Sequence, residues 1–136
     1  MSTAPADRRR LLKATWALLL QAAVLAGCGA QISDADAARA RATVERALRA
    51  PTFDDFLSSF GPEDRARMKE APVWIRWWQE KFEKNRAGWQ VAEVRGLRDG
   101  RIEVAVQHRQ RKTSRQFYRL RAERGAWLID QIESER

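Results

Sequence analysis

The hydrophobic period of the chain changes at Gly88. From Ser33 to Asn85 apolar residues recur every three or four positions, as Ala40 and Val44 do, which is the spacing of one face of a helix. After Gly88 apolar and polar residues alternate, and glycines separate four such runs. The sequence therefore predicts helices first and strands afterwards.

Cap and proline signals divide the helical part. Ser33 with Asp36, and Thr52 with Asp55, have the spacing of an N-cap and its partner three residues later. Proline is well placed at the first position of a helix, and it ends or kinks a helix already under way. Four segments are predicted as helical: Ser33 to before Pro51, Thr52 to Phe60, a helix opened by Pro62, and Val73 to Asn85, which Pro72 begins or kinks.

The alternating part predicts four strands. Their approximate bounds are Trp89 to Val94, Arg101 to Gln110, Ser114 to Glu123 and Trp127 to Ile132. Short connections imply an antiparallel meander, and its apolar face must be covered by the preceding helices. The predicted class is α+β, with N-terminal helices packed on a C-terminal four-stranded antiparallel meander.

A basic stretch and an apolar run open the chain. Arg8-Arg9-Arg10-Leu11-Leu12-Lys13 precedes a run from Ala14 to Gly27 that only two polar residues interrupt. This is the form of an export signal, and a bilayer span needs about 20 apolar residues, so a permanent transmembrane helix is the weaker alternative. We expect residues 1–27 to be cleaved as a signal peptide.

The apolar run closes with Leu25-Ala26-Gly27-Cys28, which resembles the lipobox of bacterial lipoproteins. The resemblance implies that a diacylglyceryl group is attached to Cys28, that cleavage falls between Gly27 and Cys28, and that acyl chains such as palmitate anchor the protein in the cell envelope. Gly29 in place of aspartate implies the outer rather than the inner membrane under the enteric sorting rule. An ordinary, unmodified cysteine is the alternative.

The basic stretch also resembles the twin-arginine export consensus, with Arg8 and Arg9 as the pair. Asp7 departs from the serine or threonine that is usual before the pair. A basic start serves either exporter, so the general secretory and twin-arginine routes stay open.

Without the signal, 109 residues remain, which suits one small domain. We expect residues 28–32 to be the lipidated cysteine with a short tether, and residues 33–136 to form a single α+β domain. One cysteine excludes an intramolecular disulfide. One histidine and one cysteine are too few ligands for the usual zinc site, so we expect no metal and no cofactor.

The formal net charge of +8 is unevenly distributed. Basic and acidic residues balance, at ten each, from Gln31 to Asn85, whereas twelve basic residues face seven acidic ones from Arg86 to Arg136. A basic surface favours anionic partners. For an envelope lipoprotein, lipid headgroups and polyanionic glycans fit better than nucleic acid, which lies in another compartment.

Helices followed by a meander that ends in Gly125-Ala126-Trp127-Leu128-Ile129 resemble small envelope lipoproteins of the nuclear transport factor 2-like superfamily. The resemblance covers about residues 33–133 and implies a cone of helices on a curved sheet, with acid/base groups sometimes placed inside it. His108, Tyr118 and Asp130, each on a predicted strand, are the residues this points to. A cystatin-like helix-on-sheet arrangement stays open.

The sequence holds no nucleophile elbow, no Gly-rich phosphate loop and no paired-carboxylate motif. We therefore expect no enzyme but a non-catalytic binding or assembly module. The alternatives are a small cone-fold enzyme or small-molecule-binding protein that uses a pocket near His108, Tyr118 and Asp130, and a plain anchored structural subunit.

Two further groups are candidate contact surfaces. Trp74, Trp77 and Trp78 lie within five helical positions and, at about 100° per residue, cannot all face inward, so we expect at least one to line a cleft or interface. The alternative is that they cap the edge of the core.

The second group shares one side of the third predicted strand, opposite Tyr118 and Leu120. Phe117 ringed by Arg119 and Arg121 would suit a dimer mate, an acidic envelope protein or anionic headgroups. The alternative is a solvated arginine face.

Overall fold

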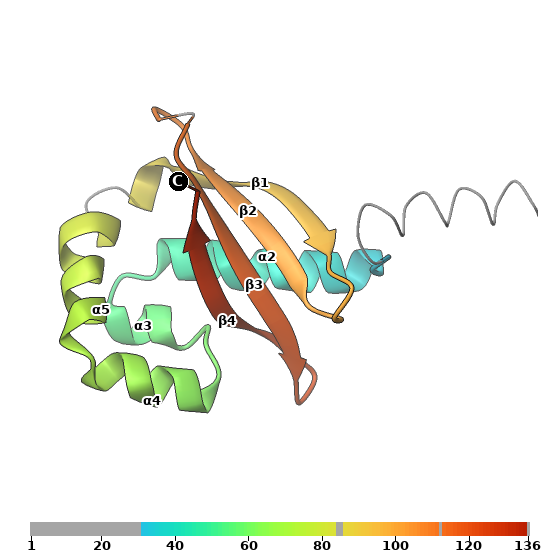
Figure 1. Ribbon diagram of the computed structural model, residues 1–136, viewed down its shortest axis with the longest axis horizontal. Helices are drawn as coiled ribbons and strands as arrows, with labels where there is room; N and C mark the ends of the chain where they lie inside the picture. Colours follow the sequence, from blue (N-terminus) through green and yellow to red (C-terminus); the bar gives the residue numbers. More distant parts are fainter. Residues whose placement is uncertain (1–30, 84–85, 112, 136) are drawn as a thin grey trace, which may run out of the picture.

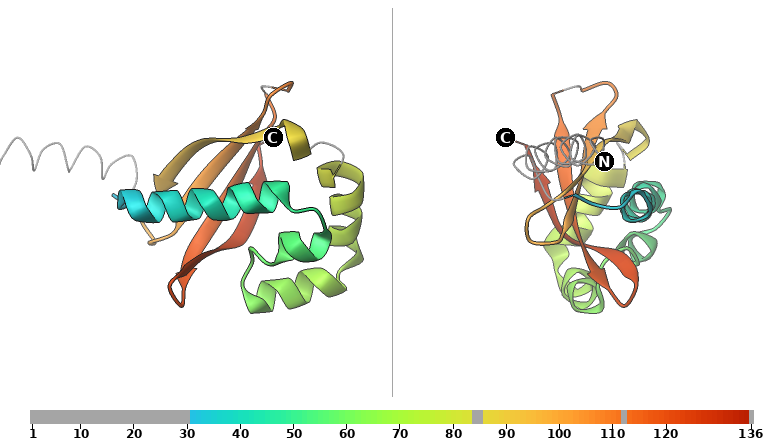
Figure 2. Two further views of the ribbon diagram at one scale, coloured as in Figure 1. Left: turned by 180° about the vertical axis from the view of Figure 1, so that it is seen from behind. Right: turned by 90° about the vertical axis from the view of Figure 1, so that its right-hand side faces the viewer.

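A computed structural model describes residues 31–83, 86–111 and 113–135, which form a twisted sheet with helices on one face and along one edge (Figures 1 and 2). The sheet is antiparallel and its strands neighbour one another in chain order. The strands are β1 Trp89–Gly96, β2 Ile102–His108, β3 Arg115–Glu123 and β4 Ala126–Ser134. The predicted α+β class, with helices first and a four-stranded meander after them, is confirmed.

The longest helix, α2 (Asp34–Arg49), lies across one face of the sheet, as the front and back views show (Figures 1 and 2). The Ser33 side chain accepts the backbone N–H of Asp36 at 3.1 Å, as the cap signal predicts. Acidic residues in the first turn and basic residues in the last turn complement the helix dipole. Local signals therefore define this helix at both ends.

Three shorter helices follow beside β4 (Figure 1). They are α3 Phe53–Leu57, α4 Pro62–Glu70 and α5 Pro72–Trp77. Thr52 caps α3 through the backbone N–H of Asp55, and a proline occupies the first turn of both α4 and α5. The second predicted helix ends at Leu57 rather than at Phe60, because residues 59 and 60 pair with β4 at the edge of the sheet instead.

The helix begun by Pro72 widens into a π-helical turn, η1 (Trp78–Phe82), where the N–H of Glu83 donates to the carbonyl of Trp78, five residues earlier. A regular α-helix joins residues four apart. A 3₁₀ turn, η2 (Arg86–Gly88), then leads into β1. The segment predicted as one helix from Val73 is thus two kinds of helix in succession, and its predicted end at Asn85 lies outside the described residues.

Tight turns join β1 to β2 and β3 to β4. Arg124 and Gly125 connect β3 to β4 with φ values of 50° and 80°, the left-handed pair of a type I′ hairpin. Gly100, at φ 87°, serves the turn between β1 and β2. There the backbone N–H and the side chain of Arg101 both donate to the carboxylate of Asp99. These hydrogen bonds, first the backbone one and second the side-chain one in size, lower the pKa of Asp99.

The core lies between α2 and the inner face of the sheet, which is the face turned toward the helices. Ile102, Val104, Val106, Tyr118, Leu120 and Ile129 form this face and are fully buried. Phe56 of α3 is the aromatic centre beside it, with ring centroids of Phe60, Trp78 and Phe82 at 5.2, 5.0 and 5.1 Å. The helices thus bury one face of the meander, as its alternation predicts.

Both edges of the sheet are irregular. At the β4 edge, Phe60 forms a parallel bridge with Ile129, and the N–H of Ile129 donates to the Ser59 carbonyl at 2.8 Å. The register of β3 with β4 skips Asp130, because Arg119 pairs with Gln131 whereas Leu120 pairs with Ile129. The register of β1 with β2 also slips, between Val91 and Glu93.

Candidate functional site

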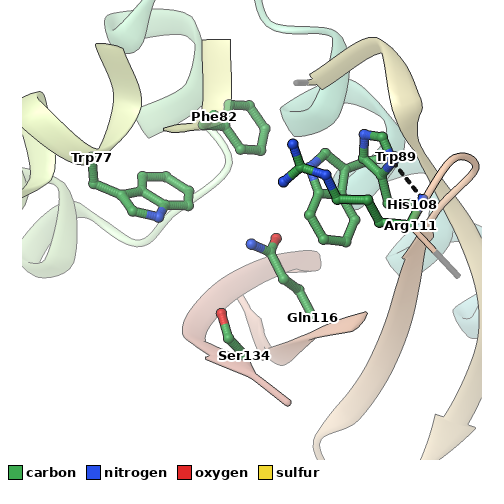
Figure 3. Close-up of a pocket in the computed structure, with 7 residues that line it drawn as sticks. All are labelled: Trp77, Phe82, Trp89, His108, Arg111, Gln116 and Ser134. Carbon is green, nitrogen blue, oxygen red and sulfur yellow. Dashed lines mark hydrogen bonds between the residues drawn. The ribbon is translucent and has the colours of Figure 1, made fainter. Parts of the chain in front are cut away.

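A cavity of about 410 Å³ opens at the end of the sheet where β2 turns into β3 (Figure 3). It is lined by residues of α5, η1 and all four strands or their loops: Trp77, Phe82, Trp89, His108, Arg111, Gln116 and Ser134. Its volume lies within the range of about 300–1,000 Å³ that small-molecule sites occupy. We call it the aromatic pocket.

Two pairs of rings form opposite walls of the aromatic pocket (Figure 3). On one side Trp77 and Phe82 pack with centroids 5.2 Å apart. On the other, Trp89 meets His108 edge-to-face at 5.2 Å. The π-helical turn builds the first wall, since Trp77 and Phe82 are five residues apart and would point in widely different directions on a regular helix.

Gln116 and Ser134 lie at the base of the aromatic pocket (Figure 3). Gln116 is buried, and its Oε1 accepts the hydroxyl of Tyr118 at 3.1 Å. Tyr118 is itself fully buried, and this burial raises the pKa of its hydroxyl above its ordinary range. Tyr118 therefore fixes the amide of Gln116 and remains a neutral phenol.

His108 is held by its own loop. Its Nδ1 accepts the backbone N–H groups of Gln110 and Arg111 at 3.2 and 3.3 Å. A nitrogen that accepts hydrogen bonds carries no proton, so the ring proton lies on Nε2, which faces Gly88. A Cβ at Gly88 would lie 2.1 Å from that nitrogen, so only glycine fits there. His108 thus shapes the loop that carries Arg111.

The three residues singled out for acid/base work do not meet in one cavity. His108 lines the aromatic pocket and Tyr118 lies buried beneath it. Asp130 instead lines a separate hollow with Phe60, Asp64 and other residues of the helical layer, and its Oδ1 lies 3.4 Å from Nη1 of Arg101. The bulge at Asp130 turns this side chain away from the other two.

The tryptophans of α5 and η1 divide between core and surface. Trp78 is buried, with 4 % of its surface exposed, whereas Trp74 and Trp77 are partly buried and pack against the core. Trp74 meets Trp77 edge-to-face at 5.8 Å, behind the wall of the pocket. The expected partly exposed tryptophans are therefore Trp74 and Trp77, and Trp77 lines a cavity.

On the outer face of the sheet, turned away from α2, charged residues form a ladder across the strands. Glu103 of β2 is buried, and its two carboxylate oxygens accept from Arg95 of β1 at 2.7 Å and from Arg119 of β3 at 3.2 Å. Arg119 also donates to Gln131 and Glu133 of β4. One carboxylate and one guanidinium therefore connect all four strands.

Acidic residues of the ladder and nearby neutralise arginines of the contact surface predicted around Phe117. Phe117 does lie on the outer face, half-buried, with the guanidinium of Arg115 5.6 Å above its ring. Arg119 is neutralised within the ladder, and Arg121 lies 3.5 Å from Glu123 and 3.9 Å from Asp64. These acidic neighbours, which sequence alternation does not reveal, reduce the charge available to an anionic partner. Contact through this face stays a prediction.

We expect Glu103→Gln to lower the free energy of unfolding by about 1–3 kcal/mol. An amide nitrogen would replace one of the two oxygens, and the two arginines would lose the buried charge they share. Equilibrium unfolding in urea, followed by circular dichroism, measures the change.

Glu133→Gln is the matched control for this ladder. Among the described residues, Glu133 pairs with Arg119 alone, and its side chain is 53 % exposed, so its loss should lower stability by less than about 1 kcal/mol. Equal losses in the two variants would show that burial of Glu103 adds nothing to the ladder.

The predictions about export and lipid attachment concern residues outside the described ranges. They concern Arg8, Arg9, Gly27 and Cys28. Across residues 31–83, 86–111 and 113–135, no group of three or more His, Cys, Asp or Glu side chains is arranged to hold a metal ion. None of the helices in the same ranges combines the length and the apolar character that a bilayer crossing requires.

Comparison with known proteins adds no relative. No protein-family model, no curated protein and no solved structure matches the chain. The resemblance to nuclear transport factor 2-like lipoproteins therefore stays a prediction that rests on element order.

Proposed function

We propose that this chain is a lipid-anchored lipoprotein of the bacterial cell envelope whose domain is a non-catalytic binding module. One observation carries the anchor: Leu25-Ala26-Gly27-Cys28 closes an apolar run that follows a basic start. Cys28 is also the only cysteine of the chain, and it lies six positions before α2 begins at Asp34. Lipid on this residue would hold the domain at the membrane surface.

The proposed anchor gives the domain an orientation. Four tether residues reach at most about 14 Å, whereas the 16 residues of α2 extend over about 24 Å. Leu48 and Arg49, at the far end of α2, line a hollow together with Trp89, which is also a wall residue of the aromatic pocket. The pocket would therefore lie at the end of the domain remote from the bilayer, open to the aqueous phase.

The arrangement of polar groups supports binding rather than catalysis. Around the aromatic pocket, His108 Nδ1 is occupied by two backbone donors and Tyr118 stays protonated. Asp130 lies in another hollow. What the pocket offers is aromatic surface with a few hydrogen-bonding groups, which is the usual composition of a ligand site.

Mass spectrometry of the protein isolated from bacterial membranes tests the anchor. We expect the mature chain to lack residues 1–27 and to begin with Cys28 carrying a diacylglyceryl group. A mature chain that begins elsewhere, or one with an unmodified Cys28, would contradict the proposal.

A further inference from the structure

The aromatic pocket presents hydrogen-bond donors. The described residues that line it include a guanidinium, an amide and a hydroxyl, on Arg111, Gln116 and Ser134, and none of these described residues is an aspartate or glutamate. Tyr118 already occupies Oε1 of Gln116, which leaves the amide nitrogen of that side chain to donate. An occupant that satisfies these groups must supply acceptors.

Arg111 favours an occupant that carries a negative charge. Within the described ranges no aspartate or glutamate oxygen lies within 4.0 Å of its guanidinium. By contrast, five other arginines of the sheet and its turns are paired with acids or stacked on a ring, at positions 95, 101, 115, 119 and 121. Figure 3 shows the Arg111 side chain extending toward Phe82. A guanidinium binds a carboxylate through two parallel N–H···O bonds.

The walls set the shape of the occupant. The pair Trp77 and Phe82 faces the pair Trp89 and His108 across the cavity (Figure 3). Aromatic walls favour a flat ring, which gains from stacked or edge-to-face contacts at centroid distances of about 4.5–7 Å. A cavity of about 410 Å³ limits the molecule to a small one.

We propose that the aromatic pocket binds a small planar aromatic carboxylate, with its ring between the walls and its carboxylate on Arg111. Gln116 and Ser134 donate to polar atoms at the base of the pocket. The inference rests on the proposed binding function and names its ligand class. No covalent step is involved.

Isothermal titration calorimetry on the membrane-extracted protein tests the ligand class, with the same nonionic detergent in cell and syringe. The probes are 1-naphthoate, the neutral 1-naphthalenemethanol with the same ring, and 1-naphthyl phosphate. We expect 1-naphthoate to bind about tenfold more tightly than the alcohol, because only the carboxylate forms a charged pair with Arg111.

Two variants locate the charge. Arg111→Gln should remove the preference for 1-naphthoate over the alcohol, chiefly by weakening the binding of 1-naphthoate. Arg109→Gln is the matched control, since Arg109 lies two positions away, donates to Gln90 and lines a different hollow. It should keep the wild-type preference.

Several outcomes would overturn the ligand class: equal affinity for acid and alcohol, no saturable binding of either, a preference that survives in Arg111→Gln, or much tighter binding of the phosphate. None of them bears on the mass of the mature N-terminus. A failure of this inference is therefore distinguishable from a failure of the lipid anchor.

Discussion

Cys28→Ser should abolish incorporation of labelled palmitate and leave an uncleaved precursor in cells. The anchor needs a sulfur nucleophile, and serine offers a far weaker one. Two acyl chains, at roughly 0.8 kcal/mol for each buried methylene, contribute on the order of 20 kcal/mol to membrane association. No other interaction proposed for this protein approaches that magnitude, so the effect should be all or none.

The measurement is palmitate labelling with immunoblotting of precursor and mature forms. Because the chain has a single cysteine, thioether-linked lipid can report on no other residue. Gly29→Ala is the matched control and should be labelled and cleaved as the wild type is. A Cys28→Ser protein that is still cleaved and partitions with membranes would disprove the anchor.

Trp78→Ala should lower the free energy of unfolding by about 3–5 kcal/mol, the usual loss for a buried tryptophan. Trp78 is 4 % exposed, and its ring lies 6.0, 5.0 and 4.9 Å from those of Phe53, Phe56 and Phe82. The cavity left behind would lie at the junction of α3, η1 and the sheet. Since a domain of this size is stable by about 5–15 kcal/mol, the variant should be marginally folded.

Trp74→Ala provides the comparison on the same helix. Trp74 is partly exposed, and among the described rings it packs only against that of Trp77, so its loss should lower stability by about 1–2 kcal/mol. Urea unfolding of both variants, monitored by circular dichroism, gives the two values. A larger loss for Trp74 than for Trp78 would mean that the aromatic core has been assigned to the wrong residue.

The features that sequence predicts well are those that depend on near neighbours. The caps at Ser33 and Thr52 form as their spacing indicates. Alternation and glycine turns locate all four strands to within two residues, so that β2, for example, ends at His108 rather than Gln110. Each of these signals is complete within a few positions of the chain.

The aromatic pocket escapes such prediction because it depends on departures from regular geometry. A helical wheel drawn at 100° per residue assumes a regular α-helix throughout. The π-helical turn that begins at Trp78 departs from that geometry, so the wheel misplaces the residues after it. The bulge at Asp130 likewise shifts the alternation of β4. Gly88 of η2 approaches His108 of β2, and Glu103 is shared by arginines of two other strands. These contacts join residues on different elements, so no local pattern contains them.

The irregular edges of the sheet bear on how this protein behaves at high concentration. A straight, exposed edge strand is a template on which further chains add, and edge-to-edge addition is one route to aggregation. At β1 the slip between Val91 and Glu93 interrupts the even row of N–H and C=O groups, and Glu93 places a charge beside it. At β4 the bridge from Phe60 already occupies part of the edge. Under the proposed lipid anchor, copies of the domain gathered at a membrane surface would thus meet without a ready surface for fibril-like stacking.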